Sequence, residues 1–277
     1  MGRLRWAALS LLVIASASVT AQRNFGEELN LGTQAFREAK YEEAIRHFQN
    51  AVALDPQNVV AHLYLATAYA ELYIPRVDST ENVRMAETAI SEYQSVLKID
   101  PHSLNSVKGV AYLHLQMKKF DDAKSYFRKA TELDGNDAEN YYSIGVIDWT
   151  QAYTIRMERR EQLKLKPEQP LINVPECWDV RSSTEGVVKE GMEMIGKALE
   201  LRSDYDDAMA YMNLMYRERA DIQCNDPGSY ASDLKAADHW VDVISTKKVK
   251  RRRRTTSSQV QLPIIPRETL NKPAPLR

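Results

Sequence analysis

The sequence predicts an all-α protein in which helix pairs stack into a right-handed solenoid of about five repeats. Residues 24–58 can be laid over residues 103–137 so that small residues, aromatic residues and helix breakers fall at matching positions. Self-similarity at this spacing, about 34 residues, is typical of stacked helix-turn-helix units. The chain has 277 residues, 44% of them hydrophobic, which is enough to bury a sizeable core.

The first unit, residues 25–58, places small and large residues where two packed helices need them. Its pattern positions are Leu31, Gly32, Ala44, Phe48, Ala51 and Pro56. The small residues let the two helices approach closely, and the large residues fill the space between neighbouring units. The proline ends the second helix, because it has no N–H to continue the hydrogen-bond ladder.

This pattern resembles the tetratricopeptide repeat, a helix-turn-helix unit of about 34 residues. The third unit, residues 104–137, carries it at Val110, Ala111, Ala123, Phe127 and Ala130. Gly135 stands where the first unit has proline, and glycine also ends helices. The resemblance implies a curved surface for another molecule and seldom a catalytic pocket.

The second and fifth units depart from the pattern in length. The second unit, residues 59–103, is extended by the segment LYIPRVDSTENV between its two helices. The fifth unit, residues 206–246, follows the pattern weakly and ends in a helix expected at 233–246. We expect this last helix to cap the solenoid, because its polar residues suit a wet outer face.

The fourth unit, residues 138–205, contains an insertion of about 34 residues, long enough for a further repeat. A further repeat would put Met157, Glu161 and Lys164 where the pattern needs small and aromatic residues. We therefore expect an elongated first helix and an irregular loop, followed by a second helix at 191–204. The helix breakers after this elongated helix are Pro167, Pro170 and Pro175.

Residues 1–21 have the order of a secretory signal peptide. Arg3 and Arg5 precede a short apolar run, and small residues follow up to Ala21. The apolar run is shorter than the roughly 20 residues that a membrane anchor needs. We expect cleavage after Ala21 and export to the periplasm or outside the cell. The chain has no Asn-x-Ser/Thr sequon, which favours an exported protein of bacterial type.

Charge is divided unevenly along the chain. Residues 23–244 hold 25 Lys and Arg against 37 Asp and Glu, a net charge of −12, whereas residues 245–277 hold 10 against 1, a net charge of +9. We expect the solenoid to span residues 22–246 and the basic, Pro-rich residues 247–277 to be disordered.

The basic run at the start of this tail is a candidate polyanion-binding site. It comprises Lys247, Lys248, Lys250, Arg251, Arg252, Arg253 and Arg254. An anionic membrane surface or an anionic polymer is a possible partner, because each cation near such a surface contributes about 1 kcal/mol. Nucleic acid is disfavoured, since no aromatic residues are interleaved for base stacking. A solvated tail without a partner is the alternative.

The two cysteines, Cys177 and Cys224, both fall in the insertions of adjacent units. Equivalent loops of a solenoid lie along one edge, so these two insertions are expected to meet. Because export to an oxidising compartment favours pairing, we expect a disulfide. Two free thiols in mobile loops are the alternative.

The sequence gives no support for an enzyme. Its five histidines share no metal-ligand spacing, and it contains no H-E-x-x-H, G-x-S-x-G or phosphate-loop motif. We therefore expect a non-enzymatic protein with no metal and no cofactor.

The family resemblance implies a binding groove, because the first helices of such repeats line the concave surface. The family's ligand-facing positions correspond here to Phe36, Arg37, Leu63, Thr67, Lys108, Tyr112, Leu115, Glu139, Tyr142, Trp149 and Arg217. Aromatic side chains with a few charges suit a protein or peptide partner, and the expected role is assembly or scaffolding. Trp149 could instead pack against the long insertion. Family members that grip chaperone carboxylates need Lys and Asn where this chain has Leu29 and Thr33, so we expect a different partner.

Overall fold

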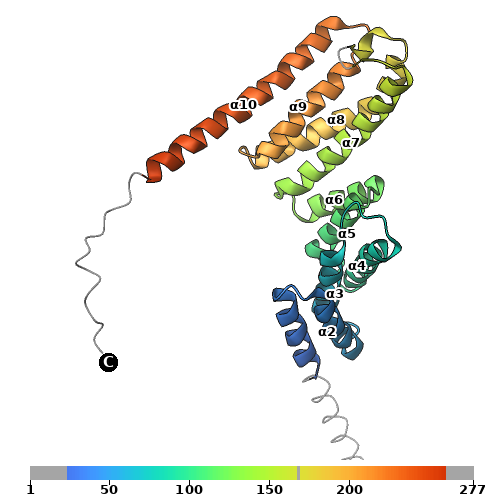
Figure 1. Cartoon of the computed structure of the whole chain (residues 1–277), viewed down its shortest axis with the longest axis vertical. Coiled ribbons are helices and arrows are strands. Elements are labelled where there is room, and N and C mark those ends of the chain that lie inside the picture. The colour runs from blue at the N-terminus through green and yellow to red at the C-terminus, as the bar shows by residue number, and fades with distance from the viewer. Residues whose placement is uncertain (1–23, 167–168, 260–277) are drawn as a thin grey trace, which may run out of the picture. The chain divides into compact units, whose positions relative to one another are not determined.

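The structure, a computed structural model, describes the backbone of residues 24–166 and 169–259 and the side chains of these segments up to Lys247 (Figure 1). Within these segments ten α-helices follow one another in five pairs, and no strand occurs. The expected all-α solenoid of five helix pairs is confirmed.

The first helix covers residues 24–37. The later elements are α2 (Tyr41–Leu54), α3 (Val59–Leu72), α4 (Thr80–Ile99), α5 (Leu104–Gln116), α6 (Phe120–Leu133), α7 (Ala138–Gln162), the 3-10 helix η1 (Leu171–Asn173), α8 (Cys177–Leu201), α9 (Asp206–Asp221) and α10 (Pro227–Gln259). No helix of the described segments is both long enough and apolar enough to cross a membrane. The expected signal peptide, residues 1–21, lies outside the described residues.

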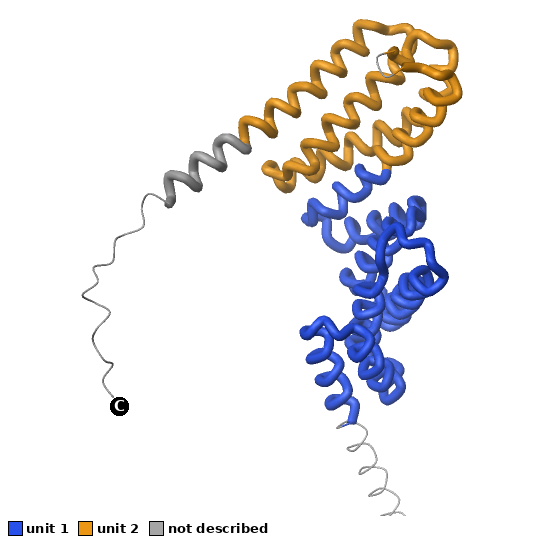
Figure 2. The backbone as a smooth tube through the Cα atoms, viewed as in Figure 1, with its two compact units in different colours: residues 1–147 blue, residues 148–277 orange. Residues whose placement is uncertain are grey.

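The chain divides into two compact units, residues 1–147 and 148–277 (Figure 2). The boundary lies inside α7, so the first turns of this helix belong to the first unit and the rest to the second. No change of composition marks this boundary in the sequence.

In the first unit, small residues allow close contact between helices, as the repeat pattern requires. A Cβ atom added to Gly32 would lie 2.5 Å from the Phe48 ring, and one added to Gly109 would lie equally close to Tyr93. Ala44 and Ala51 are fully buried beside Phe48. Leu31 remains 41% exposed.

The insertion of the second repeat, residues 59–103, forms a braced loop and an added helical turn. Because α4 begins at Thr80, only residues 73–79 connect it to α3. The buried Asn82 side chain accepts a hydrogen bond from Ile74 N at 2.8 Å. Its amide also donates to the carbonyls of Ile74 and Val77 at 2.8 and 2.7 Å.

In the second compact unit, residues 148–277, α8 is longer than expected. The sequence placed its start at residue 191, whereas the helix begins at Cys177. Residues 177–190 contain no proline, and Val180, Thr184 and Val188 repeat at helical spacing and are buried. The described part of the long insertion is therefore mostly helix, and only its residues 163–166 and 169–176 are irregular or 3-10.

The last helix also differs from the expectation. We expected disorder from residue 247, but α10 continues to Gln259. No helix breaker lies between Gly228 and Pro263, and Lys and Arg are good helix formers. The Lys247 ammonium donates to the carbonyl of Ser203. The side chains of the other six cations of the basic run, and all of residues 260–277, lie outside what the structure describes.

Candidate functional site

Several family-derived groove positions of the first unit make contacts within the unit. Phe36 packs edge-to-face on Tyr41, with ring centroids 5.3 Å apart. The Thr67 hydroxyl donates to the Leu63 carbonyl at 2.8 Å. Leu63 and Phe36 are partly buried against the core. These three side chains support the helices that carry them.

The remaining first-unit positions are more accessible. Tyr112 is 53% exposed, whereas Lys108 forms an ion pair with Asp137 at 2.6 Å. Arg37 and Glu139 are exposed, and Leu115 and Tyr142 are half-buried. Tyr112 is thus the exposed aromatic residue among the predicted groove positions of this unit.

Trp149 belongs to an aromatic cluster of the second unit. Its ring stacks on Tyr153 at a centroid distance of 4.9 Å and meets Tyr211 edge-on at 5.3 Å. The indole is half-buried. Its described ring contacts are with the same helix and with α9, so Trp149 positions Tyr153.

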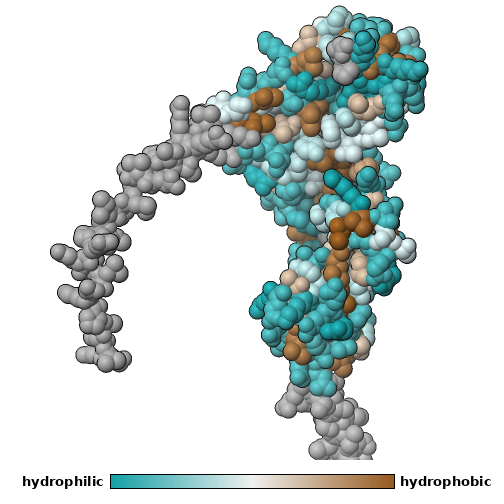
Figure 3. Space-filling model, viewed as in Figure 1, coloured by the Kyte–Doolittle hydropathy of each residue, from teal (hydrophilic) through white to brown (hydrophobic). Residues whose placement is uncertain are grey.

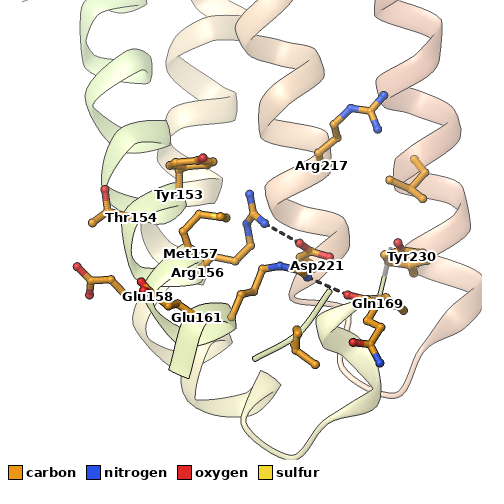
Figure 4. Close-up of a pocket in the computed structure, with 14 residues that line it drawn as sticks. Tyr153, Thr154, Arg156, Met157, Glu158, Glu161, Gln169, Arg217, Asp221 and Tyr230 are labelled. Carbon is orange, nitrogen blue, oxygen red and sulfur yellow. Dashed lines mark hydrogen bonds and ion pairs between the residues drawn. The ribbon is translucent and has the colours of Figure 1, made fainter. Parts of the chain in front are cut away.

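An open groove lies in the second unit and has a volume of about 780 Å³. The second half of α7 and the start of α10 form its sides, and α9 lies between them (Figure 4). Leu165, Gln169 and Pro170 line one end. We call this site the α7–α10 groove. Of the predicted residues it contains Arg217, whose guanidinium pairs with Asp238 of α10 at 2.8 Å.

The base of the groove is an ion-paired cluster. Arg156 donates to Glu218 at 2.6 and 2.9 Å and to Asp221 at 3.0 Å. Burial raises the pKa of the Glu218 and Asp221 carboxyls, although Arg156 opposes this rise. Burial also acts to lower the pKa of Arg156, but its bonds to these carboxylates outweigh burial and raise the pKa. One arginine therefore holds the buried Glu218 and the half-buried Asp221 on α9.

The end wall of the groove is fastened by hydrogen bonds. The buried Arg160 donates to the carbonyls of Gln169 and Lys166 at 2.9 and 2.8 Å. Further along the insertion, Asn225 N donates to the carbonyl of Ile172 at 3.0 Å. These bonds tie the insertion to α7 and to the connection between α9 and α10.

The two cysteines reinforce this attachment. Cys177 and Cys224 form a disulfide with Cα atoms 5.7 Å apart, and both residues are buried. Cys177 is the first residue of α8 and not a loop residue, while Cys224 lies between α9 and α10. The bridge therefore joins the end of the insertion to the elements that form the groove.

The sides of the groove present apolar and aromatic groups to solvent. Tyr153 and Met157, one helical turn apart on α7, are 38% and 39% exposed. Tyr230 and Leu234 of α10 are half-buried on the other side. Elsewhere the face in view in Figure 3 is largely hydrophilic, with small hydrophobic patches. Exposed apolar groups above a fixed, ion-paired base suit the binding of a partner.

Sequence reasoning missed Tyr153, Met157 and Tyr230. The first two lie beyond the length of a standard repeat helix, and Tyr230 lies on a second helix, which the family pattern does not assign to a ligand. The usable signal was the elongated helix itself, with an aromatic residue and a methionine at i and i+4. In the described segments no group of three or more His, Cys, Asp or Glu is placed to hold a metal ion.

Two family models match the chain. A TPR repeat model matches residues 36–72, and a tetratricopeptide repeat model matches residues 109–137. The "DnaJ homolog subfamily C member 7 homolog" of Schizosaccharomyces pombe is 29% identical over 39% of this chain and 21% of its own length. "Hsp70-Hsp90 organizing protein 2" of Arabidopsis thaliana is 25% identical over 52% of this chain and 22% of its own length. Human "Tetratricopeptide repeat protein 13" is 24% identical over 69% of this chain and 21% of its own length. The chain thus spans about a fifth of the length of these relatives.

Solved structures share the fold. A crystal structure of MamA has a TM-score of 0.57 at 14% identity, over 88% of this chain and all of that one. YrrB, described as a TPR protein with an unusual peptide-binding site, has a TM-score of 0.51 at 13% identity. The match covers 80% of this chain and 90% of the YrrB chain. The two repeat models thus identify tetratricopeptide repeats at residues 36–72 and 109–137, and the solved structures share the fold of the five helix pairs.

Proposed function

We propose that this protein is an exported, non-enzymatic scaffold that binds a protein or peptide partner in the α7–α10 groove. The observation that carries the proposal is the exposure of Tyr153 and Met157 opposite Tyr230, above a base fixed by Arg156. A tyrosine side chain contributes a large contact area and has few rotatable bonds to order on binding, and a methionine side chain adapts to varied partners. The groove is lined from α7 on one side and α10 on the other, which suits a peptide segment.

Export is part of this proposal. It is supported by the signal-like order of residues 1–21 and by the Cys177–Cys224 disulfide, since disulfides persist in oxidising compartments. No cofactor or metal enters the proposed activity.

The partner differs from that of the chaperone-binding relatives. "Hsp70-Hsp90 organizing protein 2" is named for two chaperones, but this chain lacks the Lys and Asn of the family's carboxylate clamp. Thr33 and Leu29 occupy the two clamp positions, and the Thr33 hydroxyl donates a hydrogen bond to the Leu29 carbonyl. The groove offers aromatic and apolar contacts in place of a carboxylate grip.

Site-specific photo-crosslinking in the source cells tests the location of the groove. A photoreactive phenylalanine derivative at Tyr153 is expected to yield a discrete adduct with the partner. Tyr64, also 38% exposed but located in the first unit, is the matched control, and Tyr112 tests the family-derived groove. Adducts at Tyr112 and none at Tyr153 would overturn the assignment, as would identical adducts at Tyr153 and Tyr64.

A second candidate function is electrostatic binding of an anionic polymer or membrane by the basic run. The observation that favours it is the continuation of α10 through residues 247–254, which carries seven cations away from Tyr230 on one helix. Seven of the eight residues at 247–254 are Lys or Arg, so the run offers no apolar stretch for insertion into lipid. This arrangement favours contact with a polyanion surface over burial in a bilayer.

A further inference from the structure

We propose that the α7–α10 groove of one molecule binds residues 261–268, the segment QLPIIPRE, of a second copy of this chain. The inference rests on the proposed function, because it names an occupant for the same groove. It is carried by three properties: the chemistry of the groove sides, the sign of the charge left at the rim, and the reach of the chain beyond α10.

The segment has the chemistry that an aromatic groove recognises. Pro263 and Pro266 bracket two isoleucines, and Arg267 follows directly. Proline fixes its own φ near −65° and drives the preceding residue to an extended conformation, so little entropy is lost on binding. Proline-containing segments of the PxxP type dock in grooves lined by aromatic side chains. Tyr153 and Tyr230 provide such sides, and Met157, one helical turn from Tyr153 on α7, also lines the groove.

The charge at the rim complements this segment. The three arginines of the groove are engaged: Arg156 by two carboxylates, Arg160 by two carbonyls and Arg217 by Asp238. Glu158 and Glu161 of α7 are exposed, and their carboxylates form no ion pair among the described side chains. The available charge of the groove is therefore negative. Arg267 supplies the opposite charge next to the second proline, and Glu268 follows it as the last residue of the segment.

The reach of the chain excludes the groove of the same molecule. Leu234 is the groove residue furthest along α10, and the helix continues to Gln259, about 38 Å further at 1.5 Å per residue. The isoleucine pair lies five and six residues beyond Gln259, which allows at most about 20 Å of extended chain. With α10 helical to Gln259, the segment cannot return to its own groove. A second copy has no such restriction.

Sedimentation velocity of the full processed chain tests the proposal. Wild type is expected to self-associate as its concentration rises from about 1 to 100 μM, a range typical of short-peptide contacts. Met157→Glu, which alters the groove, and the double change Ile264→Asp and Ile265→Asp, which alters the segment, are each expected to leave a monomer. Val241→Glu is the matched control, because Val241 is 46% exposed on α10 outside the groove, and this variant is expected to associate like wild type.

Mixing the two defective variants distinguishes exchange between copies from general loss of association. The Met157→Glu molecule keeps an intact segment and the isoleucine variant keeps an intact groove, so together they are expected to form a one-to-one complex. Arg267→Glu is expected to weaken association about twofold to fivefold, as for an exposed ion pair, and Glu158→Lys with Glu161→Lys is expected to restore it. A wild type that stays monomeric, or a mixture that forms no complex, overturns the proposal.

Failure of this proposal can be separated from failure of the groove function. If the isoleucine variant still gives the Tyr153 adduct with an external partner while wild type stays monomeric, the groove binds peptides but not this segment. If neither association nor a Tyr153 adduct occurs, both proposals fail.

Discussion

Arg156 of α7 reaches Glu218 and Asp221 of α9, residues more than 60 positions away in sequence, and pairs with both at once. The guanidinium side chain is 14% exposed, and the Glu218 side chain is 4% exposed. This contact fixes the spacing of the two helices beneath the groove, on which the exposure of Tyr153 and Met157 depends. The first prediction follows from it.

Replacing Arg156 with Met is expected to lower the free energy of unfolding by about 3 to 5 kcal/mol at pH 7, because the buried Glu218 and the half-buried Asp221 lose their counter-charge. The pKa values of Glu218 and Asp221 are already raised in the folded protein. A raised carboxyl pKa lets the folded state hold protons more readily than the unfolded state, so the stability cost grows as pH rises through the unfolded pKa values. Urea denaturation at pH 5 and pH 7 is the measurement, and the loss should be larger at pH 7. Combining Arg156→Met with Glu218→Gln and Asp221→Asn should recover much of the lost stability. An equal loss at both pH values for Arg156→Met alone would contradict the role given to the two carboxylates.

The disulfide contributes to the stability of the second unit. It closes a separation of 47 residues, for which chain entropy gives about 4 kcal/mol. Cys177→Ser with Cys224→Ser should lower the midpoint of thermal unfolding and weaken partner binding in the groove. Mass spectrometry of the unreduced protein after alkylation is the direct check, and two modified thiols would rule the bridge out.

Two glycines of α8 are expected to respond oppositely to alanine. A Cβ on Gly191 would overlap Met215 and lie 2.9 Å from Asp148 Cβ, so Gly191→Ala should destabilise by about 1 to 3 kcal/mol. Gly186, five residues earlier in the same helix, has nothing within 4 Å of such an atom. Gly186→Ala should therefore stabilise by about 0.5 to 1 kcal/mol through helix propensity. Thermal denaturation of both variants measures the difference, and the same sign for both would refute the packing argument.

His114 is expected to make the first unit sensitive to mild acid. Burial lowers the pKa of this imidazole, whose Nδ1 is buried without a hydrogen bond, while Asp122 opposes the shift. With a folded pKa below the unfolded one, the stability contribution is complete above the unfolded pKa of about 6.5 and is lost as pH falls. His114→Gln should flatten the fall in stability between about pH 7 and pH 5. Urea denaturation of wild type and of this variant across that pH range is the measurement, and His102→Gln, at an exposed histidine, is the surface control.

The basic run of α10 is expected to bind heparin or anionic vesicles at low salt. Changing its seven cations to Gln should abolish retention on heparin, and added salt should release the wild type, because exposed charges are screened within about 10 Å at 0.1 M. Arg267→Gln with Lys272→Gln, outside the run, is the control and should be retained. Binding that ignores salt, or that survives loss of the seven cations, would dismiss this function.

The sequence alone determined the helix pairs and their order. Gly32, Phe48 and Pro56 prescribe close packing and a helix stop within one repeat, and such local requirements are written in neighbouring residues. The same reasoning located the elongated first helix of the fourth unit and indicated that the two cysteines would pair.

The tertiary structure decided where the exposed binding chemistry lies. Trp149 sits at a ligand position of the family, but Tyr153 and Tyr211 cover it, and Tyr153 takes the accessible place in the groove. The start of α8 at Cys177 and the pairing of Arg156 with α9 were likewise settled by contacts across the second unit. Packing between segments far apart in sequence determines which side chains remain exposed, and the periodicity of a single repeat contains no record of that packing.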